Sequence, residues 1–229
     1  MLIAATTFVA GYVAICAVLF AYQRTLLYPA PHTKGPPASA KGKPTVVYFH
    51  GNGACAAELG WLAQWFSEQG VGFLAAEYPG YGDVPGEPTE ESLYAAAEAT
   101  LKGLGHDDVV LVGESLGSGV AVEMATRGWG KRLVLLAPYT SIADAAQAAF
   151  PFVPAKWLVR DRFDSASKAA RVKVPVLVVH GDADEIVPYP LGAKLAPMLN
   201  AELLTVKGAH HNDLWEQQDV RKRIAGFLK

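Results

Sequence analysis

The stretch VVLVGESLGSG, residues 109–119, carries the clearest structural signal in the sequence. An apolar, β-branched run enters it, two glycines bracket Ser115, and small residues with a helical pattern follow. This order predicts a strand, a tight turn and a helix, with Ser115 at the turn. Side chains at positions 113 and 117 would collide with such a turn, which explains both glycines. Ser115 is therefore a candidate nucleophile, and a glycine-rich packing turn without chemistry is the alternative that this motif alone leaves open.

Apolar runs of the same kind recur along the chain, each followed by a helical pattern. The expected strands are residues 45–50, 71–78, 108–114, 132–138, 174–181 and 201–208, and the expected helices are residues 56–69, 89–104, 115–127, 188–199 and 212–228. Continuous rather than alternating hydrophobicity is typical of parallel strands that are covered on both faces. The sequence therefore predicts an α/β domain over residues 45–229, with a mostly parallel central sheet of about six strands flanked by helices.

A serine hydroxyl needs an oriented base before it can act as a nucleophile. Asp182 and Asp184 follow the expected strand 174–181, and His210 and His211 follow the expected strand 201–208. Functional groups of parallel sheets gather beyond the carboxyl ends of the strands, and the chain order Ser, Asp, His is one that places a catalytic triad there. The residues alone leave open which aspartate and which histidine would serve.

The sequence resembles serine hydrolases of the α/β-hydrolase fold, in particular a small membrane-anchored group that includes protein depalmitoylases and ends in a GHND-type motif. The resemblance rests on FHGNG (49–53), EYPGYG (77–82), VGESLGSGVA (112–121), APYTS (137–141), PFVPAKWLVRDRFDS (151–165), VPVLVVHGDADEIVP (174–188) and GAHHND (208–213). It implies a shortened amino-terminal part of the sheet and a minimal cap.

The same resemblance implies the roles of the site residues. Asp184 matches the family's acid and His211 its base, while His210 occupies a position where the family usually has glycine. The oxyanion donors would be the backbone N–H of Leu116, directly after the nucleophile, and Asn52 in the HGNG loop, with Gly53 as a substitute for Asn52. No metal or organic cofactor is implied.

Residues 2–22 contain no charged side chain and are long enough as a helix to cross the hydrocarbon core of a bilayer. We expect a retained transmembrane anchor over residues 1–24 and a Pro/Gly-rich linker over residues 25–44; a cleaved signal peptide and a buried core helix are the alternatives. Basic residues follow the span and none precedes it, so the positive-inside rule predicts a single-pass protein with its domain in the cytoplasm.

Two further segments lead to structural expectations. The linker shows no strand-like alternation, so the 71–78 strand is expected near the edge of the sheet, covered by the linker, the anchor or another protomer. Only about 35 residues separate the strands 132–138 and 174–181, which excludes a large lid domain. The apolar segment AAFPFVPAKWLV (148–159) is expected either to line an acyl pocket or to pack in the core.

Composition narrows the function classes. The net charge of −2 and the lack of long basic blocks argue against a nucleic-acid partner, and the two distant cysteines, Cys16 and Cys55, argue against a disulfide framework. The sequence predicts a membrane-anchored serine hydrolase that cleaves carboxylic esters or thioesters of small acyl compounds, lipids or acylated proteins. The alternatives are a non-catalytic, membrane-tethered interaction protein of the same fold, and a peptidase or amidase that uses the same triad.

Overall fold

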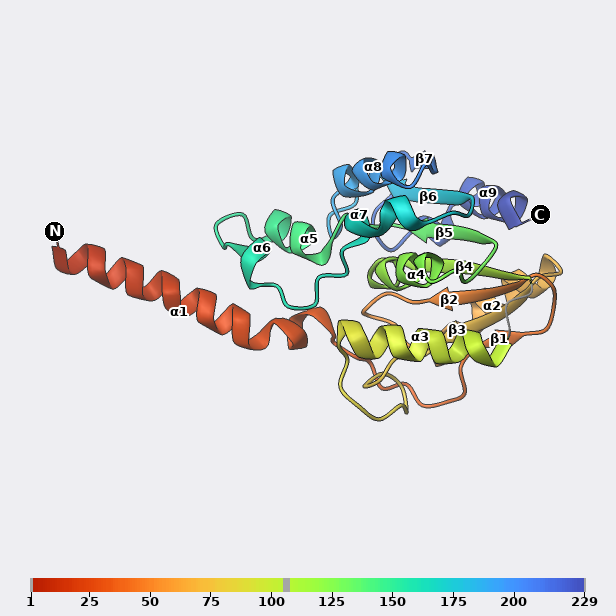
Figure 1. Cartoon of the computed structure of the whole chain (residues 1–229), viewed down its shortest axis with the longest axis horizontal. Coiled ribbons are helices and arrows are strands. Elements are labelled where there is room, and N and C mark those ends of the chain that lie inside the picture. Colours follow the sequence, from red (N-terminus) through yellow and green to blue (C-terminus); the bar gives the residue numbers. More distant parts are fainter. Residues whose placement is uncertain (1, 105–107, 229) are drawn as a thin grey trace.

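The computed structural model describes residues 2–104 and 108–228. Its centre is a seven-stranded sheet with helices on both faces (Figure 1). The strands, in order across the sheet, are β1 (Ser39–Ala40), β3 (Gly72–Ala76), β2 (Thr45–Phe49), β4 (Val109–Glu114), β5 (Arg132–Leu136), β6 (Val176–Gly181) and β7 (Glu202–Val206). All neighbouring pairs are parallel except β1 and β3, which are antiparallel. The predicted α/β class with a mostly parallel sheet is confirmed.

About six strands were expected and the sheet has seven, because the linker contributes one. Ser39 and Ala40 pair with Leu74 and Phe73 at the edge of β3, and the N–H of Ala75 donates to the carbonyl of Ala38 over 3.0 Å. A strand of two residues is too short to show a hydrophobic alternation, so the sequence pattern gave no sign of it. The linker thus pairs with part of the edge of β3.

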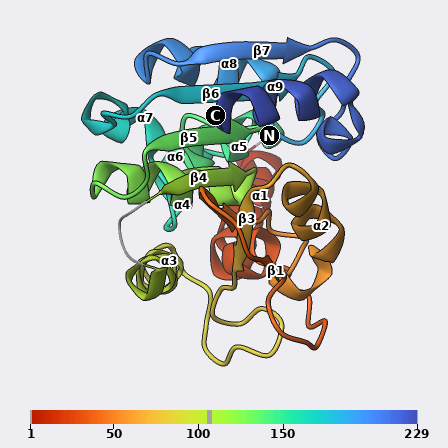
Figure 2. The same ribbon diagram turned by 90° about the vertical axis from the view of Figure 1, so that its right-hand side faces the viewer.

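The sheet is covered on both faces by helices whose apolar side chains form two separate clusters. The long covering helices are α2 (Gly60–Glu68), α3 (Glu90–Leu104), α4 (Leu116–Thr126), α8 (Tyr189–Met198) and α9 (Gln218–Leu228). Val47 and Phe49 of β2 join the cluster that includes α3, α4 and α8, whereas Val46 and Tyr48 join the cluster that includes α2 and α9. Figure 2 shows α3 and α2 on opposite sides of the sheet. Burial on both faces explains the continuous apolar runs of the strands.

Short helices occupy the chain between β5 and β6, where a large lid was not expected. They are α5 (Ile142–Ala149), α6 (Ala155–Leu158), α7 (Ser165–Lys168) and the 3₁₀ turn η2 (Ala169–Arg171). Two further 3₁₀ turns are η1 (Ala56–Glu58) and η3 (Leu214–Glu216). We refer to the segment 148–162, which contains α6, as the cap; α5 leads into it (Figure 1).

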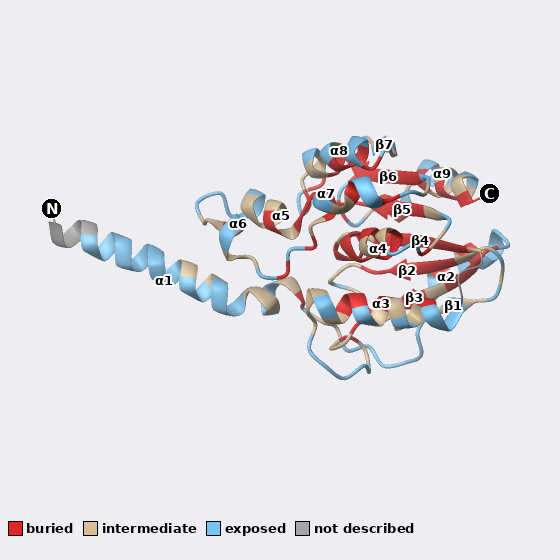
Figure 3. Cartoon of the chain, in the orientation of Figure 1, coloured by how far each residue is buried: buried red, intermediate tan, exposed pale blue. Residues whose placement is uncertain are grey.

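The first helix, α1 (Leu2–Leu27), extends away from the domain (Figure 1) and is mostly exposed (Figure 3). It ends at Leu27, whereas the expected anchor ended at residue 24. Among the described residues it is the one helix that is long and apolar enough to cross a membrane: Thr6–Leu27 has a mean hydropathy of 1.6, and none of it is buried inside the protein. The exposure of α1 excludes a buried core helix. A retained anchor and a cleaved signal sequence share the same apolar composition, so the composition does not distinguish them.

Candidate active site

Ser115 lies at the turn between β4 and α4, in a backbone conformation that side-chain-bearing residues rarely adopt. Its φ is +49° and its ψ −117°, and its N–H donates to the carbonyl of Leu136 over 2.9 Å. A Cβ added to Gly117 would lie 2.0 Å from the carbonyl oxygen of Phe49, and one added to Gly113 would lie 2.4 Å from that of Gly117. The expected reason for both glycines is confirmed: the turn holds Ser115 out of a backbone that leaves no room for side chains on either side.

His211 connects Ser115 to Asp184 through its two ring nitrogens. Nε2 lies 2.9 Å from Oγ of Ser115, and Nδ1 lies 2.8 Å from Oδ2 of Asp184. With a proton on Nδ1, the imidazole donates to the carboxylate and accepts from the serine hydroxyl. Both His211 and Asp184 are buried. The three side chains, which are far apart in the sequence, form one hydrogen-bonded chain at the carboxyl ends of β4, β6 and β7.

The neighbouring aspartate and histidine lie outside this chain. The carboxylate of Asp182 accepts from the N–H of Gly208 over 2.6 Å, a contact that fixes the loop after β7. His210 is largely exposed, and its Nδ1 lies 3.0 Å from Oε2 of Glu185. This pairing raises the pKa of His210. The geometry therefore brings Ser115 together with His211 and Asp184, the residues that the family resemblance selects.

The carboxylate of Asp184 is held by more groups than His211 alone. Its Oδ1 accepts from the N–H groups of Ile186 and Val187 over 2.9 and 2.8 Å, and Nε2 of the buried His180 lies 3.2 Å from its Oδ2. Burial acts to raise the pKa of Asp184, but the hydrogen bonds from His180, His211 and Val187 outweigh it, and the pKa lies below its usual value. Asp184 is thus a fixed anion against the imidazole.

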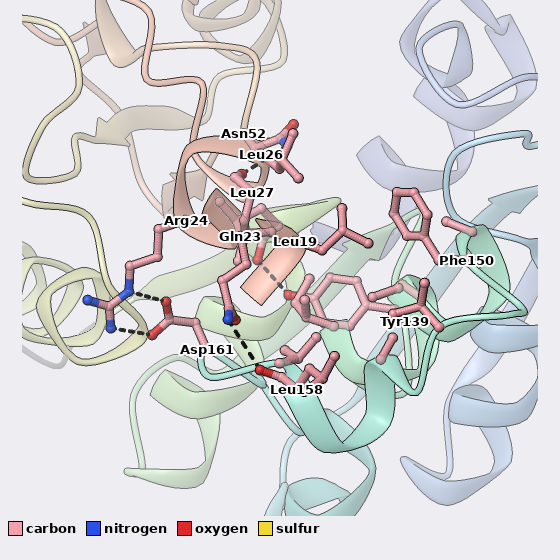
Figure 4. A pocket seen from close by; sticks show the side chains of 18 of the residues that line it. Leu19, Gln23, Arg24, Leu26, Leu27, Asn52, Tyr139, Phe150, Leu158 and Asp161 are labelled. Atoms are coloured by element: carbon pink, nitrogen blue, oxygen red, sulfur yellow. Dashed lines mark hydrogen bonds and ion pairs between the residues drawn. The ribbon is translucent and has the colours of Figure 1, made fainter. Parts of the chain in front are cut away.

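Both expected oxyanion donors border the space in front of Ser115. Leu116 is the first residue of α4, and N–H groups in the first turn of a helix have no acceptor within that helix. Asn52 lies in the loop after β2, and its side-chain Nδ2 donates to the carbonyl of Leu27 over 3.1 Å, at the end of α1 (Figure 4). Leu116 and Asn52 both line the cavity with Ser115, whereas Gly53 does not.

The pairing of His50 with Glu77 was not identified from the sequence. His50 is fully buried, and its Nε2 lies 2.9 Å from Oε1 of Glu77. The other oxygen of Glu77 accepts from the N–H of Ala56 over 2.8 Å, and the hydroxyl of Tyr78 donates to the carbonyl of His50 over 3.1 Å. The sequence did contain a signal for this pairing, because Glu77 follows the apolar strand β3 directly. These contacts fix the loop that carries Asn52.

A second group that the sequence analysis did not identify is the half-buried Glu114, directly before Ser115. Glu114 accepts from the hydroxyl of Tyr48, which in turn accepts from Nε1 of Trp215 over 3.1 Å. Burial raises the pKa of Glu114, while the hydrogen bond from Tyr48 acts in the opposite direction. The chain of contacts ties the nucleophile turn to η3, which follows His211 in the sequence.

A cavity of about 310 Å³ lies in front of Ser115 (Figure 4). Asn52, Ser115 and Leu116 line it, and the rest of the lining is mainly apolar side chains from α1, α5 and the cap. The segment 148–159, for which the sequence left two interpretations open, contributes Phe150 and Leu158 to the lining. Phe152 and Trp157 of the same segment are exposed.

The arrangement has the parts needed for nucleophilic attack on an acyl group: a presented hydroxyl, an oriented base and backbone donors beside it. Across residues 2–104 and 108–228, no group of three or more His, Cys, Asp or Glu side chains is placed to hold a metal ion. Cys55 is buried beside the loop after β2, and its Sγ lies 3.8 Å from the carbonyl of Thr33.

Two family models match successive, overlapping parts of the domain. A family model described as "Alpha/beta hydrolase family" matches residues 46–169, and one described as "TAP-like protein" matches residues 140–229. An uncharacterized protein of Mycobacterium tuberculosis is 36% identical over 191 residues, which are 80% of this chain and 66% of the relative. The human alpha/beta hydrolase domain-containing protein 17B is 31% identical over 202 residues, 83% of this chain and 68% of the relative. The chain thus spans about two thirds of the length of these relatives.

Solved structures share the fold at lower sequence identity. The monoacylglycerol lipase of Paleococcus ferrophilus has a TM-score of 0.65 and 22% identity, with 85% of this chain and 98% of that chain covered. The enol-lactonase of Burkholderia xenovorans has a TM-score of 0.65 and 18% identity, with 82% and 92% covered. At this level of identity the likeness concerns the arrangement of the sheet and its helices.

Proposed function

The chain belongs to the alpha/beta hydrolase family, and on that premise we propose that it is a membrane-anchored serine hydrolase that cleaves carboxylic esters or thioesters. The observation that carries the proposal is the hydrogen-bonded chain from Ser115 through His211 to Asp184, with Ser115 in the lining of an apolar cavity. A serine without an oriented base would be a weak nucleophile at neutral pH. His211 would be that base, and its hydrogen bond to Asp184 would fix the imidazole tautomer.

In the acylation step, Oγ of Ser115 attacks the carbonyl carbon of the substrate while Nε2 of His211 takes the hydroxyl proton. The negative charge on the carbonyl oxygen is stabilised by the N–H groups of Leu116 and Asn52. The tetrahedral intermediate collapses to an acyl-Ser115 ester, and the leaving alcohol or thiol takes the proton from His211. Asp184 stays ionised and stabilises the imidazolium.

In the deacylation step, water attacks the acyl-Ser115 carbonyl and gives a proton to His211. Collapse of the second tetrahedral intermediate releases the carboxylic acid and returns the proton to Oγ of Ser115. The strained φ of Ser115 keeps Oγ accessible from the cavity in both steps. Since Asp184 is buried and hydrogen-bonded on both oxygens, the imidazole keeps its orientation through the cycle.

The apolar lining of the cavity supports an acyl substrate, because an apolar chain buried there leaves water. The resemblance to depalmitoylase-related hydrolases extends the proposal to acylated proteins and lipids. We further propose that α1 is a retained single-pass membrane anchor, as the resemblance to the membrane-anchored group with a GHND-type motif implies. Arg24 and the basic residues of the linker, on the carboxyl side of the span, support a cytoplasmic location of the domain.

A fluorophosphonate probe, applied to the full-length protein in detergent, tests the proposal. We expect labelling of the wild type and complete loss of it in Ser115→Ala. Ser118→Ala is the matched control, since Ser118 is buried in the first turn of α4, directly after Ser115, and does not line the cavity. The labelled enzyme is then compared with the unlabelled one on ester, thioester and amide panels. A folded wild type that stays unlabelled supports the non-catalytic alternative, and turnover of amides alone supports the peptidase alternative.

A further inference from the structure

The helix α1 does more than extend from the domain, because its last turns form one wall of the cavity in front of Ser115. Leu19, Phe20, Leu26 and Leu27 line the cavity, together with Gln23 and Arg24 (Figure 4). From Leu19 to Leu27 the helix advances by about 12 Å, at 1.5 Å per residue. The opposite wall is made of α5 and the cap. The acyl space is therefore formed between a membrane-type helix and the folded domain.

Polar contacts hold α1 in a defined position against the cap. Arg24 makes a two-pronged ion pair with Asp161, with Nε 2.8 Å and Nη2 3.2 Å from the carboxylate oxygens (Figure 4). Gln23 donates to the carbonyl of Leu158 over 3.2 Å and accepts from the N–H of Arg160 over 2.8 Å. A helix that served only as a tether would need no contacts of fixed geometry. These contacts instead set the distance between the two walls.

Further contacts continue along the span. The guanidinium of Arg160 lies 4.2 Å from the ring centre of Phe20, and the hydroxyl of Tyr12 donates to the carbonyl of Phe152 over 3.0 Å. Tyr12 lies well inside the apolar segment Thr6–Leu27. The cap therefore runs beside the part of α1 that is apolar enough for the bilayer.

The rim of the cavity is apolar and exposed. Leu26, Phe150 and Ile186, from three separate parts of the chain, all line the cavity and are all exposed. Exposed apolar patches of this kind mark ligand or membrane contacts, because they are costly in water.

We propose that α1 is a specificity-determining wall of the substrate site, and that the substrate is a long-chain acyl ester or thioester that resides in the membrane. Its acyl chain lies between α1 and the cap, with the carbonyl carbon at Ser115. The inference rests on the proposed hydrolase function and deepens it. The reaction is the hydrolysis described above. The new inference is that α1 selects substrates by the length of the acyl chain.

Narrowing the α1 wall tests this inference. In the full-length protein, Leu19→Trp fills part of the space, while Val18→Trp places the same side chain at the next position, which is exposed and does not line the cavity. Hydrolysis of p-nitrophenyl butyrate and p-nitrophenyl palmitate is measured in the same mixed micelles. We expect Leu19→Trp to lower the ratio of kcat/KM for the palmitate to kcat/KM for the butyrate by about 10-fold or more. We expect Val18→Trp to leave this ratio unchanged.

A cross-linking measurement on the wild type needs no folded variant. A long-chain fluorophosphonate with a diazirine in its alkyl chain is expected to label Ser115. On irradiation, it is expected to cross-link to the peptide that contains residues 19–27. Cross-links confined to α5 and the cap, or equal effects of Leu19→Trp and Val18→Trp on the palmitate, overturn the α1 wall. Failure of the probe to label Ser115, together with no turnover of the butyrate, overturns the hydrolase proposal itself, so the two failures are distinguishable.

Discussion

The floor and the walls of the cavity are built in different ways. On the floor, Ser115 lines the cavity, and hydrogen bonds join it to His211 and through His211 to Asp184, which do not line the cavity. All three residues follow parallel strands of the sheet. The walls come from α1, α5 and the cap, which lie outside the sheet and meet through a few polar contacts between apolar surfaces. The backbone hydrogen bonds of the sheet therefore fix the floor, whereas the walls depend on how a membrane-type helix lies against the domain.

This difference separates two kinds of mutational effect. Under the proposed function, a change on the floor should remove the chemistry for every substrate, because each acyl group would meet the same Ser115 and His211. A change in the walls should alter which acyl chain fits and how the protein contacts a membrane, with the reaction itself intact. The predictions below test this separation, from the floor outward.

The largest effect is expected from the base. His211→Gln removes the group that takes the proton from Ser115, so kcat should fall by about 10⁶-fold for short and long substrates alike. His210→Gln is the matched control, since His210 contacts exposed Glu185 and not Ser115. Turnover of p-nitrophenyl butyrate, read beside fluorophosphonate labelling, measures both. An inactive His210→Gln with an active His211→Gln would reverse the assignment of the base.

The next effect is expected from the acid. Asp184→Asn keeps the shape of the side chain but favours the wrong imidazole tautomer, so kcat should fall by about 10⁴-fold. Asp182→Asn retains the oxygen that accepts from Gly208 and should leave kcat unchanged. Because the pKa of Asp184 is lowered, its carboxylate stays ionised well below neutral pH, and Asp184 should add no acid limb to the wild-type kcat/KM profile at the ordinary pKa of an aspartate. A limb near the ordinary pKa of an aspartate would contradict this.

The lowered pKa of Asp184 also makes the stability of the folded state depend on pH. A carboxylate whose pKa is lower in the folded than in the unfolded chain stabilises the fold above its unfolded pKa, about 3.9, and this contribution is lost as the pH falls toward the folded value. Thermal unfolding of wild type and Asp184→Asn should therefore differ most near neutral pH and converge in strong acid.

The floor was predictable from the sequence because its chemistry needs specific residue types at strand ends. The glycines around Ser115 mark a turn without room for a Cβ, and the order of Ser115, Asp184 and His211 follows the order of β4, β6 and β7. The sheet was predictable for a similar reason, since strands buried on both faces are apolar at every position. Strand β1 was not predictable, because a strand of two residues is too short to show a hydrophobic pattern.

The walls were only partly predictable. The apolar segment 148–159 was identified, but its choice between the core and the cavity depended on where α1 lies. The pairing of Arg24 with Asp161 joins residues that are 137 positions apart, and no spacing rule connects Arg24 with the segment 151–165 that contains Asp161. A hydropathy pattern identifies an apolar helix, but gives no information on which of its faces contacts the rest of the chain.

The smallest effect is expected at the outer face of the cap. Trp157 is 87% exposed and lies in α6, beside α1, whereas Trp61 is 53% exposed and lies in α2, on the side of the domain away from α1 (Figure 1). If the walls face the bilayer, an exposed indole on the cap gains by burial at the lipid interface. In vesicles of brominated phosphatidylcholine, quenching of tryptophan fluorescence should therefore decrease in Trp157→Phe and stay at the wild-type level in Trp61→Phe.

Neither substitution should change the free energy of unfolding by more than about 0.5 kcal/mol, since both side chains are exposed and outside the cavity. Hydrolysis of p-nitrophenyl butyrate should be the same in both variants, because the floor is untouched. Equal quenching in Trp157→Phe and the wild type would show that the cap stands clear of the lipid. The acyl chain would then reach Ser115 from water, and the floor and walls would face the same solvent.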